Sequence, residues 1–388
     1  MIAHIFKLIW NKKKSNALMI LEILLAFLIL FGVLTFITYN LNRFQKPLGF
    51  SAEDVLLIRL PYQNDLDSAQ IAERNLNLKR QLKAIPVIEH VGFTSSATPF
   101  TENSSKSTSD DYGFEIERYI VELDEGIDET LDITLLEGRW FEEGDDQSNY
   151  TPIILNKYFL DTYFPGKNML DSMISLGSEF KLIGVVEDYR YFGKFTEPKP
   201  TSIVYIPSTS SYYGTLAVKL KKGTPPTFEE ELDKLITDIT KDPGFLIENA
   251  SSLQRRNERP HWVKITALLS MSIFLIINVA LGLFGILLYN ISRRRSEIGL
   301  RKALGAHNGL ISRQFILEIF TITFIALIVG LFFAVQFPIF NVLDISAIDY
   351  TYALLGSTII IILLVLLCTW YPSRQASLIH PSTALHED

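Results

Sequence analysis

Residues that could carry catalytic chemistry are scattered along the 388 residues of this chain and form no recognisable motif. The best candidates for a hydrolytic set, His90, Ser95 and Asp188, lie far apart, and sequence separation does not show whether they converge. The six histidines have no metal-ligand spacing, so we expect no metal site. We therefore interpret these residues as structural, and an enzyme built on them is the least favoured function.

The sequence also contains neither an ATP-binding motif nor a calcium-binding motif. Neither Gly166-Lys167 nor Gly193-Lys194 has the earlier glycine and the following Ser or Thr of a phosphate-binding loop. The acidic clusters at 110–111 and 142–146 lack the spaced oxygen ligands of a calcium loop and are interpreted as solvated surface. If ATP drives this protein, another subunit has to bind it.

The composition predicts membrane spans joined to a soluble part. The chain is 48% hydrophobic yet 20% charged, and its single cysteine excludes an internal disulfide. Acidic residues outnumber basic ones within 41–261, whereas basic residues dominate elsewhere. Four apolar runs are long enough to cross a bilayer: residues 17–39, 265–289, 315–337 and 353–370. The predicted fold is therefore a membrane protein with four transmembrane α-helices and a large α+β extracytoplasmic domain, 41–261, inserted between helices 1 and 2.

The segment Arg293–Leu317 orients these spans, since Lys and Arg resist translocation and it carries six of them between two spans. It predicts that the 291–313 loop, both termini and the tail 372–388 lie in the cytoplasm. Residues 1–16 read as an amphipathic helix on the cytoplasmic side of the membrane. The first span is too long for a signal-peptide core and is expected to be an uncleaved anchor.

The extracytoplasmic domain is predicted to be a mixed sheet with helices on one side. Strand–helix–strand units are expected near residues 54–93 and 215–248, the second opened by a capping box of Thr227 and Glu230. Asn156 is expected to cap a short helix. The polar stretch 101–113 is interpreted as a mobile loop.

The basic loop is predicted to contain a short amphipathic helix. Leu300, Ala303 and Leu304 fall on one face, and Glu297 can pair with Arg301 one turn later. Gly305 is a usual residue just past a helix end, and a second helix is expected from about residue 308. Charge alone leaves two interpretations equal: a loop that only sets topology, or an elbow that receives a cytoplasmic partner.

Two polar features lie inside the predicted spans. Asn278, Gly282 and Gly285 share one helical face, which favours close packing, including packing on a second subunit, over a substrate-binding role for Asn278. Glu22 lies near the cytoplasmic end of the first span. It is expected to pack on a neighbouring helix or to reach the headgroups, in preference to acting in a proton relay.

The loop motif resembles a signature of the MacB/FtsX-like ABC transporter permeases. It reads Arg295-Ser-Glu-Ile-Gly-Leu-Arg-Lys-Ala-Leu-Gly-Ala306 and follows a long span. Weaker similarities lie in Leu136-Glu-Gly-Arg-Trp-Phe141 and Ile183-Gly-Val-Val-Glu-Asp-Tyr189, and in the endings Pro372-Ser-Arg-Gln-Ala376 and Pro381-Ser-Thr-Ala-Leu385. The order of one span, an exported domain and three spans also agrees with this family.

The resemblance implies a non-catalytic permease in the bacterial cytoplasmic (inner) membrane, surrounded by lipid and with no nucleic-acid partner. It implies a dimer with a second copy or a paralogue, each docking a cytoplasmic ABC ATPase that binds the ATP and Mg²⁺, so that this chain binds no cofactor. The implied function is mechanotransmission that drives export or efflux of a peptide, drug or lipoprotein-type substrate. The alternative is a transmembrane regulator of an extracytoplasmic cell-wall hydrolase. The implied coupling helix contains Arg295, Glu297, Ile298, Gly299, Arg301, Lys302, Leu304 and Gly305.

Overall fold

The computed structural model describes residues 13–61, 66–94, 98–101, 104–207, 210, 214–242 and 244–377. Within them the chain forms two compact units. The first, the membrane unit, contains Met1–Asn42 and Trp262–Asp388. The second, the exported domain, contains Arg43–His261. The amphipathic helix predicted at 1–16 lies outside the described residues up to residue 12.

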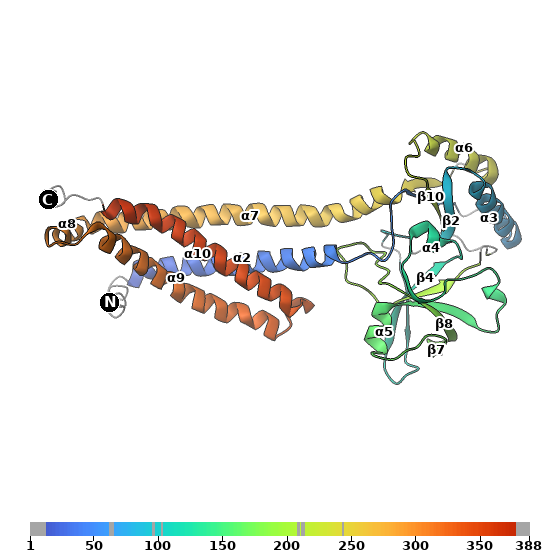
Figure 1. Cartoon of the computed structure of the whole chain (residues 1–388), viewed down its shortest axis with the longest axis horizontal. Helices are drawn as coiled ribbons and strands as arrows, with labels where there is room; N and C mark the ends of the chain where they lie inside the picture. Colours follow the sequence, from blue (N-terminus) through green and yellow to red (C-terminus); the bar gives the residue numbers. More distant parts are fainter. Residues whose placement is uncertain are drawn as a thin grey trace. The chain divides into compact units, whose positions relative to one another are not determined.

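Four long helices build the membrane unit, as the predicted fold class requires (Figure 1). Each is long and apolar enough to cross a bilayer. They are α2 (Lys13–Gln45), α7 (Ala250–Arg293), α9 (Asn308–Ile339) and α10 (Ala347–Ser377). Two short helices join them, α8 (Arg295–Ala303) and η2 (Val342–Asp344). Pro372, where the tail 372–388 was expected to begin, lies inside α10. A proline breaks a helix only where it clashes or removes a needed hydrogen bond, and α10 continues past it.

One apolar cluster holds these spans together. Ile23 and Phe27 of α2 are fully buried against residues of the other three helices, including Leu283 and Ile322. Gly330 of α9 is required at this packing, because a Cβ there would lie 2.5 Å from the Phe27 ring. Small residues let helices in lipid approach closely, and dispersion contacts then stabilise the bundle.

An 11-stranded mixed sheet forms the centre of the exported domain. Its main path is β11-β1-β10-β2-β4-β9-β6-β8-β5, with β3 paired to β4 and β7 to β8. Only the pairs β4–β9 and β6–β8 are parallel. The strands are β1 (Val55–Arg59), β2 (Ile88–Thr94), β3 (Ser105–Ser109), β4 (Ile116–Leu123), β5 (Leu135–Gly138), β6 (Thr151–Asn156), β7 (Met173–Ser175), β8 (Glu179–Val186), β9 (Thr201–Tyr205), β10 (Thr215–Leu220) and β11 (Leu246–Asn249). The short helices are α3 (Ser68–Lys83), α4 (Ile127–Leu131), η1 (Asp145–Gln147), α5 (Lys157–Tyr163) and α6 (Phe228–Thr240).

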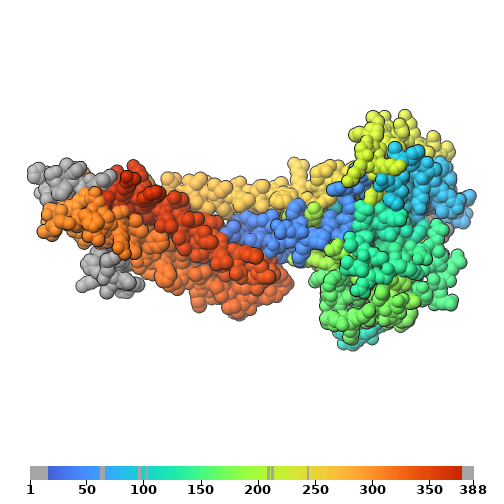
Figure 2. Space-filling model, viewed as in Figure 1, coloured from blue at the N-terminus to red at the C-terminus, as the bar shows by residue number. Residues whose placement is uncertain are grey.

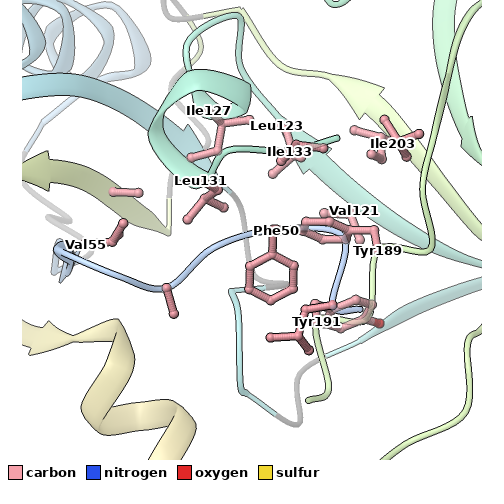
Figure 3. Packing of buried hydrophobic residues seen from close by; sticks show 14 of the residues in the cluster. Phe50, Val55, Val121, Leu123, Ile127, Leu131, Ile133, Tyr189, Tyr191 and Ile203 are labelled. Carbon is pink, nitrogen blue, oxygen red and sulfur yellow. The ribbon is translucent and has the colours of Figure 1, made fainter. Parts of the chain in front are cut away.

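Both predicted strand–helix–strand units are present, as β1-α3-β2 and β10-α6-β11. Alternation along β1 sends Leu56 and Ile58 to one face, where they pack with α3 and α6. Val55 and Leu57 point to the other face, where Ile127 of α4 packs (Figure 3). The prediction that helices cover one side is therefore correct for α3 and α6 and wrong for α4.

Three local predictions have different outcomes. Asn156 caps α5 as predicted, since its Oδ1 accepts the Phe159 N–H at 3.1 Å. The capping box at Thr227 is wrong, because this residue has a helical backbone and its side chain makes no capping hydrogen bond. The stretch 101–113 contains strand β3, whose pairing with β4 orders its polar backbone.

Candidate functional site

The elbow (residues 291–313) is a helix–turn–helix between two spans. Helix α8 ends at Ala303 and α9 begins at Asn308. Gly305 adopts φ +96° and donates its N–H to the Lys302 carbonyl, while Ala306 donates to the Arg301 carbonyl, both at 3.0 Å. This pair of bonds is a Schellman motif, which favours glycine because of the positive φ. The turn predicted from Gly305 is therefore present.

One side of α8 packs on the membrane unit. Ile298 and Gly299 are buried, and Ile298 joins a small cluster with Ile291, Ile311, Phe315 and Ala376. These side chains come from α7, α9 and α10. The buried side of α8 therefore contacts the ends of three spans at once.

A buried ion pair lies beneath this cluster. Arg294 is 9% exposed, and its two Nη atoms donate to the Glu318 carboxylate of α9 at 2.8 and 3.0 Å. Its guanidinium also lies 5.9 Å from the Phe315 ring centroid. Such a bidentate pair fixes orientation as well as charge. Arg294 is thus a structural residue of the elbow, in addition to contributing to the basic charge of the loop.

The sequence contained a signal for this pair. Glu318 is an acid within an apolar span, and such residues pair with one another or with backbone groups. Its position near the start of the span that follows a run of three arginines could have suggested a partner among them.

Arg301 joins the two helices of the elbow. Its Nη2 donates to Glu297 at 2.5 Å, so the predicted pair forms. Its Nη1 donates to the Gln314 side chain of α9 at 2.6 Å, a contact that sequence reasoning missed. Arg301 therefore links α8 to α9 through their side chains.

The other side of α8 is open. Leu300 is 53% exposed and Leu304 is 81% exposed, and Ala303 is exposed between them. The apolar face predicted from periodicity therefore exists but is not buried in this chain. The orange segment in Figure 2, at one end of the membrane unit, includes the elbow. Arg295 and Lys302, the remaining cations of the predicted coupling helix, are half-buried.

The predicted packing face on α7 divides into two parts. A Cβ on Gly282 would lie 2.2 Å from Glu22 of α2, so this glycine packs within the chain. Glu22 therefore packs on a neighbouring helix, as expected. Asn278 and Gly285 are exposed, and the Asn278 amide donates to the Phe274 carbonyl of its own helix at 2.7 Å.

An apolar cavity of about 630 Å³ lies among α2, η2, the end of α9 and the start of α10. Its lining contains no charged side chain. The polar groups of Thr35 and Tyr350 in the lining already bond to main-chain carbonyls. The cavity therefore offers mainly apolar contact.

The hydrolytic candidates do not share partners. His90 pairs with Glu129 at 2.9 Å, and Asp188 accepts the Tyr158 N–H at 3.0 Å. Burial raises the pKa of Asp188 above its usual range. Ser95 lies outside the described residues.

The acidic cluster near residue 145 is occupied by protein groups. Asp145 accepts two hydrogen bonds from Arg139 and one from the Glu142 N–H. The hydrogen bond from Arg139 holds the pKa of this carboxyl below its usual range, although burial opposes it. This arrangement favours the structural interpretation of the cluster.

Two family descriptions together cover most of the chain. Residues 17–235 match the MacB-like periplasmic core domain, and residues 269–381 match the FtsX-like permease C-terminal region. The first match covers the first span and most of the exported domain, and the second covers the other three spans.

Similar proteins include the macrolide export ATP-binding/permease protein MacB from two organisms. The Mannheimia succiniciproducens protein is 24% identical over 65% of this chain and 41% of its own length. The Neisseria meningitidis protein is 24% identical over 78% of this chain and 48% of its own length. The chain thus spans about half the length of the curated relatives that it matches.

Solved structures with some likeness include two exported domains. The periplasmic region of MacB from Actinobacillus actinomycetemcomitans has a TM-score of 0.38 and 18% identity, covering 55% of this chain and 97% of that one. The extracellular domain of the noncanonic ABC-type transporter YknZ has a TM-score of 0.36 and 13% identity, covering 50% and 100%. The core-domain family alone matches more than half of this chain. The loop motif, the four spans and the inserted α+β domain of this chain agree with that family. The protein therefore belongs to the MacB/FtsX-like ABC transporter permease family.

Proposed function

We propose that the open face of α8 docks a separate cytoplasmic ATPase, which binds ATP and Mg²⁺ and drives this permease. The observation that carries the proposal is the 81% exposure of Leu304 on a helix whose opposite side is fixed by Ile298 and Arg301. Exposed apolar side chains on a rigid element are typical centres of protein interfaces. The cations around them suit a partner with acidic residues at its rim.

In this proposal ATP binding moves the elbow, and the spans transmit that movement to the exported domain. The tie between Arg301 and Gln314 supports the first step, because α8 then moves together with α9. The similar MacB proteins are named for macrolide export, which supports export or efflux as the proposed class of function. The chain would lie in the bacterial inner membrane with both termini in the cytoplasm.

A second copy of this chain is proposed to pack on α7. Met271, Phe274, Asn278, Leu281 and Gly285 are exposed at alternating spacings of three and four residues. This spacing forms one seam along a helix, and small or polar residues in it permit close approach. Cysteine at Asn278 in a Cys368→Ser chain should cross-link two copies in membranes, whereas cysteine at Val279, which is buried, should not.

Leu304→Glu tests the docking proposal most directly. The change should abolish co-purification of the ATPase and its stimulation by the permease, with binding weakened about tenfold or more. The variant should still reach the membrane, since Leu304 supports little of the fold. Leu136→Glu, at an exposed leucine of the exported domain, is the matched control and should leave both readouts unchanged. Full stimulation by the Leu304→Glu chain would exclude this face as the docking site.

Arg301→Glu tests the elbow itself. It breaks the bonds to Glu297 and Gln314 and places two acids together, so the ATPase should become uncoupled while the protein stays in the membrane. Coupling equal to that of the unaltered chain would show that the elbow angle does not matter.

The proteins that bind the exported domain distinguish transport from the alternative function, regulation of a cell-wall hydrolase. Pull-down with the full chain should recover a peptide, a lipoprotein or an outer-membrane tunnel protein if the function is transport. Recovery of a cell-wall hydrolase would favour regulation.

A further inference from the structure

The segment Asp188–Glu197 follows strand β8 and is anchored in the core of the exported domain. Tyr189 and Tyr191 are each 1% exposed and pack in the same cluster as Phe50 (Figure 3). The Tyr189 and Phe50 ring centroids are 5.0 Å apart. Alternation in an extended segment sends Arg190, which lies between the two tyrosines, in the opposite direction.

Arg190 binds the last turn of α2, through Arg43, and residues 46 and 47 just beyond its end. It is 2% exposed. Its Nη1 donates to the carbonyls of Lys46 at 2.8 Å and Pro47 at 3.2 Å, and its Nη2 donates to the Arg43 carbonyl at 3.0 Å. The last carbonyls of a helix lack intrahelical partners and carry partial negative charge, so a cation there is favourable. Arg190 thus caps a helix that ends 145 residues earlier in the sequence.

The same guanidinium holds its own segment in place. Nη2 also donates to the main-chain carbonyls of Lys194 and Thr196. The planar guanidinium therefore donates both to carbonyls of residues 43–47 and to carbonyls of its own segment. The several N–H groups of an arginine permit this, whereas the single ammonium of a lysine does not.

Side chains strengthen the contact with α2. Glu197 accepts from Arg43 Nε at 2.5 Å and lies 3.5 Å from Lys46 Nζ. Burial alone would raise the pKa of Glu197, but the bond from Arg43 and the nearby positive charges outweigh it and lower the pKa. Phe195 packs on Phe44, with ring centroids 5.3 Å apart.

The segment also contacts the N-terminal part of α7. The Phe195 ring stacks on His261 with centroids 4.5 Å apart and planes within 2°. Gly193 has φ +105°, and a Cβ there would lie 2.4 Å from Oδ1 of Asn257. Any side chain at 193 would therefore push α7 away or strain the backbone.

We infer that Asp188–Glu197 is the joint through which helices α2 and α7 pass their movements to the exported sheet, with Arg190 as its central positioning residue. The inference rests on the proposed ATP-driven function. Both helices extend beyond this domain, α2 from Lys13 and α7 to Arg293. The joint links their ends to strand β8 through one short segment. Arg190 alone donates to five main-chain carbonyls across this contact, those of Arg43, Lys46, Pro47, Lys194 and Thr196.

Hydrogen exchange on the full chain in nanodiscs tests the joint without an ATPase. In Arg190→Ala, amides of residues 43–50 and 190–197 should lose protection together, by about tenfold or more, while β6 and β8 keep theirs. Arg190→Lys should lose less of this protection, because the positive charge remains although the several N–H donors of the guanidinium are lost.

Arg118→Ala is the matched control. Arg118 is also a buried arginine of this domain (5% exposed), and it bonds Ser202 Oγ and the Leu176 carbonyl. Its loss should leave residues 43–50 protected. Equal loss of protection in both variants, or loss throughout the sheet in Arg190→Ala, would show that Arg190 only stabilises the core. Unchanged protection in Arg190→Ala would overturn the joint directly.

Adding MgATP to the chain in complex with its co-purifying ATPase separates the joint from the proposed function. The unaltered complex should change its exchange within 43–261 when MgATP binds. Arg190→Ala should keep ATPase binding and lose that response. If no ATPase co-purifies with the unaltered chain, the proposed function fails, whereas the joint is still judged by the exchange of residues 43–50. A preserved MgATP response in Arg190→Ala would exclude the joint.

Discussion

The two units each bury an arginine beside a helix end, and they neutralise it in different ways. In the membrane unit Arg294 is paired with one carboxylate, that of Glu318. In the exported domain Arg190 is surrounded by main-chain carbonyls, and its charge faces the end of α2. A buried charge needs compensation in both cases, because desolvation is costly.

The difference decides how each contact can be broken. The pair at Arg294 depends on a single partner side chain, so removal of Glu318 leaves a buried cation without compensation. The carbonyls around Arg190 cannot be removed by substitution, so that contact is lost only through Arg190 itself. The ion pair of the elbow can thus be broken by substitution at two positions, and the carbonyl contacts of Arg190 only at Arg190.

The largest effect is expected from Glu318→Ala. Breaking a buried ion pair costs about 3–5 kcal/mol, because the remaining charge has no partner. The elbow should unfold locally, which limited proteolysis of the full chain at residues 294–310 would detect. The exported domain should resist the same protease treatment.

Replacing both partners sharpens this comparison. Arg294→Met with Glu318→Leu removes the charges together, and such exchanges are often neutral or stabilising. The double variant should recover protease resistance. If it stays as sensitive as Glu318→Ala, then shape rather than charge compensation holds the elbow.

A smaller loss is expected from Lys79→Met in the exported domain. Lys79 Nζ donates to Asp124 at 2.6 Å and to Glu125 at 2.7 Å, and the Asp124 side chain is fully buried. Burial would lower the pKa of Lys79, but the two negative charges outweigh it and raise the pKa. Without the lysine, two acids remain side by side and one of them takes up a proton, which limits the cost to about 2–4 kcal/mol.

Urea unfolding of the full chain, followed by the tryptophan signal, measures this loss. Lys83→Met, on an exposed residue of the same helix, should change stability by less than about 0.5 kcal/mol. Equal midpoints for Lys79→Met and Lys83→Met would show that the buried lysine gives no net stability.

The fold was largely predictable because its strongest signals are local. Span length follows from the thickness of the bilayer, and the two strand–helix–strand units follow from periodicity. Strand β3 was missed because Ser105–Ser109 is polar, and only its pairing with β4 makes it a strand. The cap at Thr227 failed because a box motif does not fix the backbone angles that a cap needs.

Only those features of the candidate site that lie close together in the sequence were predictable. Glu297 with Arg301, the Gly305 turn and the start of α9 lie within a few residues of one another. The bonds Arg294–Glu318 and Arg301–Gln314 join different helices, and Arg190 reaches a helix end far away in sequence. Periodicity and charge describe one element at a time, so such pairings appear only when the elements are packed.

The smallest effect concerns a half-buried carboxyl for which the described residues provide no ion pair. Asp128 of α4 has an Oδ1 without a hydrogen-bond partner among the described residues, and burial raises the pKa of its carboxyl to about 6. A raised acid pKa means that folding favours the protonated form. The free-energy cost of burying the ionised carboxyl is therefore absent below about pH 4 and is fully present once the pH has risen through 6.

Asp128→Asn should thus stabilise the exported domain at pH 7.5 by about 1 kcal/mol, a value discounted for partial exposure. The gain over the unaltered chain should shrink toward zero as the pH approaches 4. Urea midpoints of both chains between pH 4 and 8 measure it. A gain that is independent of pH would show that the amide improves packing. No gain at any pH would show that water compensates Asp128, and that only buried cations in this protein depend on a specific partner.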